Sequence, residues 1–239
     1  MAPPVATLYL IRHGQASYGE EDYDRLSSRG REQATALGKH LANLGLNALY
    51  SGPLVRQRQT AEAAAEAAAE AGQPLPASEV VPELAEYQAF EMLKHMIPRL
   101  VAEDPRFAAL PSTRTPRLLD EAFHAVLGRW SRDEWTTDDV ERIGPFVERI
   151  RAGLDRLLRS AGSGARLACV TSAGPIGVAV GLLFGASAER MVRTSVVIRN
   201  ASITELRFRS QGFDWQPEQL SLITFNATYH LAAELHTER

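Results

Sequence analysis

Short apolar stretches alternate with amphipathic ones along the chain. The stretch from Thr7 to Ile11 mixes β-branched, aromatic and aliphatic residues, which predicts a short buried strand. Residues 26–45 then place apolar side chains at helical spacing along one face, with a serine near the start and Gly45 at the end. This second stretch predicts an amphipathic helix.

The same alternation continues along the rest of the chain. Further strands are predicted within 46–52, 78–87, 165–172, 201–209 and 220–228, and further helices within 53–72, 140–160 and 175–185. Residues 90–135 are less regular and contain four prolines, so we expect an inserted helical cap there. The pattern predicts a single domain over residues 1–239, an α/β sandwich of three layers with a mostly parallel central sheet.

Composition narrows the class of protein. The hydrophobic fraction of 45% and the charged fraction of 23% are ordinary for a soluble globular protein, and a net charge of −3 gives no reason to expect nucleic acid as a partner. The longest mostly apolar run, residues 174–186, is too short to cross a bilayer, and residues 1–12 lack the basic region of a secretory signal. We therefore expect a cytoplasmic protein that binds no membrane; its oligomeric state is not predicted.

The first strand ends in Arg12-His13-Gly14, which puts a guanidinium and an imidazole where open α/β sheets place their ligands. By itself, the tripeptide favours a charged strand end with a histidine satisfied by the backbone, because so short a motif is weak evidence. Phosphate-loop and metal-ligand spacings are missing from the sequence, and Val170 stands where a nucleophile-elbow serine motif needs glycine. Cys169, the only cysteine, has no arginine shortly after it and is predicted to be a buried strand residue.

Other segments change the interpretation of His13. Arg56 begins the helix after the second strand, Glu83 and Glu86 follow the third, and Ser172 lies between the strand at 165–172 and the next helix. Together with "LIRHGQA", "LSSRGREQA", "SGPLVRQRQTA", "RNASITEL" and "NATYHL", these segments resemble the histidine phosphatase superfamily, also called the phosphoglycerate mutase-like family. The resemblance covers the core and leaves out the cap.

The resemblance implies a mechanism and a phosphoglycerate mutase-like fold. His13 would attack phosphorus and carry the phosphoryl group as phosphohistidine, while Arg12 and Arg56 bind its oxygens. Glu86 would donate a proton to the leaving alcohol and later help water to attack. The arginines supply the positive field, so neither a metal nor a cofactor is expected.

Some assignments within the site are less direct. Glu86 matches the acid motif of the family better than Glu83, which stays the alternative. Gly14 and His230 are expected near the site without contact to the phosphoryl group, and a structural role is favoured for His230. His40 is expected at the surface. We expect a solvated face, rather than substrate contacts, for the arginines of the cap: Arg99, Arg106, Arg114, Arg117, Arg129 and Arg132.

The sequence departs from the family at Ser172, where relatives have a second histidine. A serine at a helix start can donate to phosphate but adds no positive charge, so reduced activity is expected. The favoured function is a phosphatase that acts on phosphorylated small molecules; a catalytically weak member that binds a phosphorylated ligand or protein is the alternative. A phosphoglycerate mutase is less favoured, because Glu86 is followed by "YQAFEML" rather than by the residues that follow the acid in the mutases. The substrate itself is not predicted.

Overall fold

The structure is a computed structural model that describes residues 5–17, 24–110, 116–216 and 218–238. Its centre is a six-stranded sheet with the strand order β3-β2-β4-β1-β5-β6. The strands are β1 (Val5–Arg12), β2 (Ala48–Ser51), β3 (Ser78–Val80), β4 (Arg166–Thr171), β5 (Ile203–Arg209) and β6 (Leu220–Ala227). Strands β3, β2, β4 and β1 are parallel to one another, and β5 and β6 add an antiparallel edge. This arrangement confirms the predicted mostly parallel sheet.

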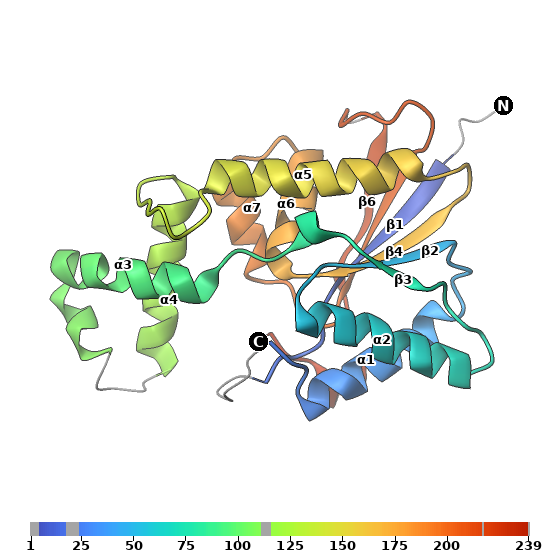
Figure 1. Cartoon of the computed structure of the whole chain (residues 1–239), viewed down its shortest axis with the longest axis horizontal. Coiled ribbons are helices and arrows are strands. Elements are labelled where there is room, and N and C mark those ends of the chain that lie inside the picture. The colour runs from blue at the N-terminus through green and yellow to red at the C-terminus, as the bar shows by residue number, and fades with distance from the viewer. Residues whose placement is uncertain (1–4, 18–23, 111–115, 217, 239) are drawn as a thin grey trace.

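Helices cover both faces of the sheet (Figure 1). They are α1 (Ser28–Leu41), α2 (Val55–Glu70), α3 (Ala89–Glu103), α4 (Pro116–Ser131), α5 (Ile143–Ser160), α6 (Ala173–Leu183) and α7 (Ala188–Ser195). One core cluster joins the sheet to α1 and α2, and a larger cluster joins it to α5, α6 and α7. Helices α1 and α2 pack closely because Gly38 has no side chain: a Cβ there would lie 2.1 Å from the carbonyl oxygen of Ala64.

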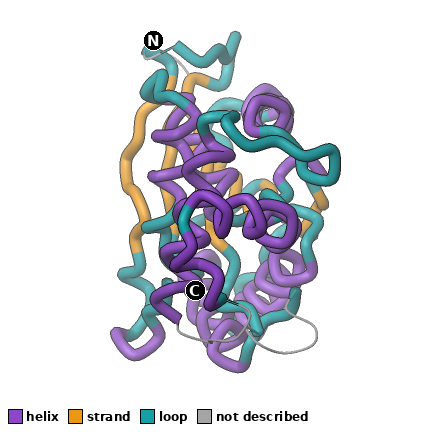
Figure 2. Tube along the Cα trace, turned by 90° about the vertical axis from the view of Figure 1, so that its left-hand side faces the viewer, coloured by secondary structure: helices purple, strands orange, loops and turns teal. Residues whose placement is uncertain are grey.

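The range expected to form a cap contains α3 and α4. Both helices lie to one side of the sheet in Figure 1, and in Figure 2, viewed from that side, helices cross in front of the strands. Pro116 begins α4 and Pro105 begins a short 3₁₀ helix, two positions where a missing N–H costs no helical hydrogen bond. Pro98 lies inside α3, and Pro111 and Arg114 lie outside the described residues.

Two helices differ from the sequence prediction. The helix predicted over 140–160 begins only at Ile143, because the N–H of Val140 bonds to Thr137 in a preceding turn and Pro145 occupies the first helical turn. Helix α7 was not predicted, because its eight residues follow α6 almost directly and carry too short an apolar pattern.

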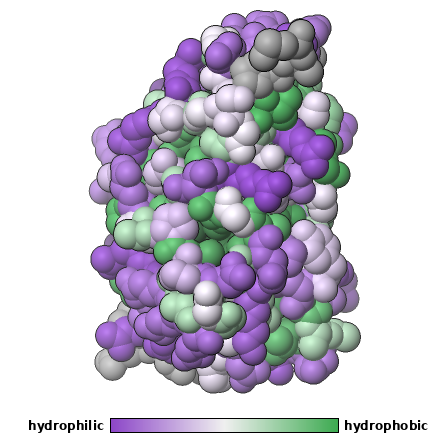
Figure 3. Space-filling model, turned by 90° about the vertical axis from the view of Figure 1, so that its right-hand side faces the viewer, coloured by the Kyte–Doolittle hydropathy of each residue, from purple (hydrophilic) through white to green (hydrophobic). Residues whose placement is uncertain are grey.

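The end of the molecule opposite the cap range is shown in Figure 3, where hydrophobic residues form a patch among hydrophilic ones. Among the described helices, none has both the length and the apolar character that a bilayer-spanning segment needs.

Candidate active site

The carboxyl ends of β1 and β4 bring the predicted site together. The N–H of His13 donates to the carbonyl oxygen of Thr171 at 2.8 Å, so the segment after β1 lies against the segment after β4. His13, Arg56, Glu86 and Ser172 come from four different segments and meet at this edge of the sheet through the contacts described below. This is the edge at which parallel α/β sheets place their ligands.

The hydrogen bonds of His13 assign its tautomer. Its Nδ1 lies 2.7 Å from the carbonyl oxygen of Gly14, which can only accept, so Nδ1 carries the proton. Its Nε2 therefore carries no proton, and its lone pair accepts a hydrogen bond from Nε of Arg56 at 3.0 Å. Burial, helped by the charges of Arg56 and Arg12, holds the pKa of His13 well below its usual value. These contacts and the lowered pKa favour a neutral imidazole whose unprotonated nitrogen, Nε2, faces Arg56.

The backbone around His13 is held by several neighbours. Its carbonyl oxygen accepts from the N–H of Ala201 at 3.1 Å and from the side chain of Asn200 at 3.2 Å. The N–H of Gly14 donates to the hydroxyl of Thr60 at 3.0 Å. A Cβ on Gly14 would lie 2.5 Å from the carbonyl oxygen of Gly30, so this position requires glycine. Gly14 thus orients the imidazole through its carbonyl and lets α1 approach.

Arg56 is held by an acidic residue that the sequence analysis did not identify. Its Nη1 forms an ion pair of 2.7 Å with Asp24, and the Arg56 side chain is 11% exposed. The same carboxylate accepts from the N–H of Val55 at 2.9 Å, which caps the start of α2. No short-range pattern could have revealed Asp24, because its partners lie about thirty residues further along the chain.

Arg12 contacts backbone oxygens from two other segments. Its guanidinium donates to the carbonyl oxygens of Ile198 and Glu238, the second at 2.9 Å. Its charge helps to lower the pKa of His13 and opposes the rise in the pKa of Glu86. The contact with a phosphoryl group that the sequence predicts for Arg12 stays a prediction.

The two candidate acids have different surroundings. Glu86 accepts from the N–H of Gly174 at 3.0 Å and from that of Tyr87 at 3.1 Å, at the beginning of α6. Burial raises its pKa, although these two hydrogen bonds and the charges of Arg56 and Arg12 act in the opposite direction. Glu83 instead forms an ion pair of 2.9 Å with Arg156 on α5. Both residues are partly exposed, but it is the Glu86 carboxyl whose pKa desolvation raises, which suits a proton donor.

Gly174 makes room for this carboxyl group. A Cβ at Gly174 would lie 2.0 Å from Oε1 of Glu86 and 2.9 Å from the ring of Tyr87. The glycine that follows Ser172 and Ala173 in the sequence therefore allows the acid to approach the first turn of α6.

Ser172 is the N-cap residue of α6 and is fully buried. Its Oγ does not cap the helix; it accepts from Nε2 of Gln57 at 2.8 Å. Gln57 was also missed in the sequence analysis. The many polar residues of "VRQRQTA" predict an exposed segment. In the structure, however, Gln57 is buried.

The segment after β6 places His230 against α1. Its ring stacks on that of His40 from α1 at a centroid distance of 5.5 Å, and Tyr229 contacts His40 at 5.2 Å. His40 is partly exposed, and the segment after β6 covers the rest of its ring. Burial lowers the pKa of His230 to about 4 and lowers that of His40 as well.

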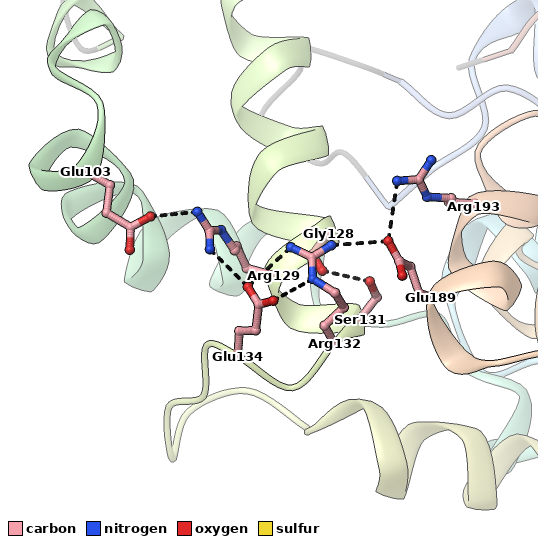
Figure 4. Close-up of polar contacts among 8 residues, drawn as sticks. All are labelled: Glu103, Gly128, Arg129, Ser131, Arg132, Glu134, Glu189 and Arg193. Atoms are coloured by element: carbon pink, nitrogen blue, oxygen red, sulfur yellow. Dashed lines mark hydrogen bonds and ion pairs between the residues drawn. The ribbon is translucent and has the colours of Figure 1, made fainter.

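The cap arginines in the described residues mostly contact acidic or aromatic side chains. Figure 4 shows Arg129 between Glu103 and Glu134, and Arg132 between Glu134 and Glu189 of α7. Arg106 and Arg117 pair with acidic neighbours, and Arg99 lies over the ring of Trp135. Among the described part of the chain, no three side chains of the metal-binding types gather as a metal site.

Comparison with known proteins places this arrangement in a family. The profile of the histidine phosphatase superfamily (branch 1) matches residues 8–218. The chain therefore belongs to the histidine phosphatase superfamily. No curated protein matches the chain.

Solved structures share the fold at low sequence identity. A mycobacterial glucosyl-3-phosphoglycerate phosphatase is 20% identical with a TM-score of 0.63, and the match covers 94% of this chain and 100% of that one. A phosphoglycerate mutase from Bacillus anthracis str. Sterne is 20% identical with a TM-score of 0.64 and 94% coverage of both chains. YhfR from Bacillus stearothermophilus is 17% identical with a TM-score of 0.65, covering 94% of this chain and 98% of that one. These similarities establish the phosphoglycerate mutase-like α/β fold.

Proposed function

We propose that the chain is a phosphatase that hydrolyses phosphomonoesters through a phosphohistidine on His13. The observation that carries the proposal is the tautomer of His13: Nδ1 bears the proton and Nε2 presents its lone pair toward Arg56. A histidine fixed in this state is a nucleophile at neutral pH. Membership of the histidine phosphatase superfamily supports the assignment.

The first half of the reaction forms the phosphoenzyme. Nε2 of His13 attacks phosphorus, and the bond from phosphorus to the ester oxygen breaks. The proton of Glu86 goes to that oxygen, so the alcohol leaves neutral. The side chain of Arg56, whose Nε lies 3.0 Å from Nε2 of His13, is close enough to bind the oxygens of the transferring group, and Arg12 adds a second positive charge.

The second half releases phosphate. Glu86, now a carboxylate, takes a proton from water as the water oxygen attacks phosphorus, and the bond to Nε2 breaks. His13 returns to its neutral state and Glu86 to its protonated state. The charges of the two arginines take the place of a metal ion, so we propose that the reaction is metal-independent.

Ser172 supports the second candidate, a catalytically weak member that binds a phosphorylated ligand or protein. A serine hydroxyl brings no positive charge to the site, and the loss of one preorganised donor costs about 10²–10³ in rate. Glu86, whose pKa is raised by desolvation, favours the enzyme, because a binding protein needs no proton donor. Two structural neighbours, a phosphatase and a mutase, are named after phosphorylated small molecules. We therefore propose that the substrate is a phosphorylated small molecule in the cytoplasm.

The proposal is tested by covalent labelling. The wild-type protein, incubated with a radiolabelled aryl phosphate and quenched rapidly, should carry an acid-labile, base-stable label that His13→Ala lacks. His124→Ala, which changes an exposed histidine of α4, is the matched control and should be labelled like the wild type. Hydrolysis unchanged in His13→Ala would rule out the mechanism. Vanadate binding without any turnover by the wild type would support the binding protein.

A further inference from the structure

The amide of Gln57 has an orientation that its neighbours define. Gln57 is fully buried, and its Oε1 accepts from the backbone N–H of Leu54 at 3.0 Å. Its Nε2 lies 3.4 Å from the carbonyl oxygen of Leu84, which can only accept. An N–H on one side and a carbonyl on the other leave a single arrangement of the amide. Nε2 therefore faces Ser172 as a donor.

This orientation determines what the Ser172 hydroxyl does. A serine hydroxyl has one proton and two acceptor positions. Nε2 of Gln57 occupies one acceptor position at 2.8 Å, and no hydrogen bond of the described residues uses the proton. The hydroxyl proton thus stays available at the beginning of α6, two residues before Gly174, whose N–H binds Glu86.

The surroundings of the amide keep it in place. A Cβ on Gly52 would lie 2.2 Å from Oε1 of Gln57, so the glycine at the end of β2 makes room for it. Leu84, whose carbonyl oxygen Gln57 contacts, also accepts from the hydroxyl of Thr171 at 2.7 Å. The amide consequently links the start of α2, the segment that leads to Glu86, and the end of β4.

We propose that Gln57 is a positioning residue that turns the Ser172 hydroxyl proton toward a bound phosphoryl oxygen. Gln57 and Ser172 act as one unit: the amide donates to Oγ, and Oγ–H donates to the substrate. The inference rests on the proposed function, since it assigns a role within the phosphomonoester site of His13.

The same contact bears on the family's second histidine. An imidazole that followed the direction of the Ser172 hydroxyl would have its Cγ near the present Oγ, 2.8 Å from Nε2 of Gln57. That separation is shorter than a van der Waals contact of carbon with nitrogen. A histidine at position 172 in this rotamer therefore requires the Gln57 side chain to move, so the two positions are coupled.

The first experiment is a double-mutant cycle on vanadate affinity. Gln57→Met keeps the length of the side chain and removes the donor, and it is measured in the wild type and in Ser172→Ala. In the wild type, Gln57→Met should weaken vanadate binding about 10- to 100-fold, the value of one hydrogen bond to a charged group. In Ser172→Ala it should have no further effect, because the hydroxyl to be oriented is gone. Gln59→Met is the control, since Gln59 lies on the same helix and its amide accepts from Leu26 instead.

The second experiment does not depend on the folding of Gln57→Met, and it tests the steric part of the inference. Ser172→His alone is compared with Ser172→His combined with Gln57→Ala, by kcat on an aryl phosphate and by melting temperature. The combined variant should exceed the single variant in both measurements. Equal or lower values would overturn the steric part of the inference.

The outcomes separate this inference from the proposed function. If the wild type binds vanadate and hydrolyses the ester, but Gln57→Met weakens binding equally with and without Ser172, Gln57 has only a structural role. A wild type that neither binds vanadate nor hydrolyses any ester overturns the proposed function and this inference with it.

Discussion

At the sheet edge, two titratable side chains have pKa values displaced in opposite directions. Burial lowers the pKa of the His13 imidazole and raises that of the Glu86 carboxyl, because in each case the charged form loses its water. The shifts favour an unprotonated His13 and a protonated Glu86, which are the states that the proposed nucleophile and the proposed acid need. Pairs of groups whose surroundings separate their pKa values in this way are typical of acid–base and nucleophilic catalysis.

The role of Glu86 leads to a prediction about leaving groups. Glu86→Gln keeps the shape of the side chain and removes the acid, so it should slow hydrolysis of an alkyl phosphate about 10²–10⁴-fold, the usual contribution of a general acid. An aryl phosphate with an activated leaving group should be affected much less, because its departing oxygen needs no proton. Steady-state kinetics on both esters measures the difference.

Glu83→Gln provides the control, since its carboxylate pairs with Arg156 instead. It should leave both rates close to those of the wild type. Equal losses on the two esters in Glu86→Gln would count against Glu86 as the acid and favour Glu83.

The elements of this fold were predictable to different degrees. Strands β1, β2 and β4 are short apolar runs that end at polar or glycine residues, and the helices between them show an apolar face, so local pattern was enough. Contacts between distant segments were not predictable in this way. Ser172 meets Gln57 across 115 positions, and no local pattern encodes that meeting.

Family motifs partly replace that missing information. They pointed to His13, Arg56 and Glu86, all of which lie at the same sheet edge. They gave no information about Asp24, which contacts Arg56 from a loop, or about the orientation of Gln57. They also gave no information about the stacking of His230 on His40 of α1.

The packing of the segment after β6 on α1 predicts how stability depends on pH. The pKa of His230 is about 4 in the folded chain and ~6.5 when unfolded, so the unfolded state binds more protons between these values. Its contribution to stability is complete above about pH 6.5 and is lost as the pH falls toward about 4. His230→Phe keeps a ring in place and should reduce the drop in the free energy of unfolding between pH 7 and pH 5, measured by urea titration.

Two comparisons check this prediction. His124→Phe, at an exposed position of α4, should leave the drop unchanged. The pKa of His13 is lowered too, so its titration also reduces stability as the pH falls. His230→Phe should therefore keep part of the drop in the free energy of unfolding. An undiminished drop in His230→Phe would mean that the ring is not desolvated by α1.

For the molecule as a whole, two of the contacts around the end of α4 differ in what they contribute. The ion pair between Arg132 and Glu189 joins it to α7, but both side chains are about one-third exposed, and such pairs contribute little to stability. The other contact is aromatic: the ring of Trp130 lies 5.4 Å from Tyr87 and 5.6 Å from Phe146 of α5. Because Tyr87 follows Glu86 directly, the aromatic contact connects α4 to the candidate acid.

This connection predicts that a change in α4 alters the chemistry of the site. Trp130→Ala and Trp135→Ala each remove a buried indole, 1% and 2% exposed, and each should destabilise the chain by about 3–5 kcal/mol. The ring of Trp130 packs against Tyr87, whereas Trp135 lies between Arg99 and Arg129. Trp130→Ala should therefore lower the ratio of the alkyl phosphate rate to the aryl phosphate rate. The effect should be weaker than that of Glu86→Gln. Trp135→Ala should leave this ratio unchanged. Kinetics at a temperature well below both melting points gives the two ratios, and equal ratios would show that α4 has no influence on Glu86.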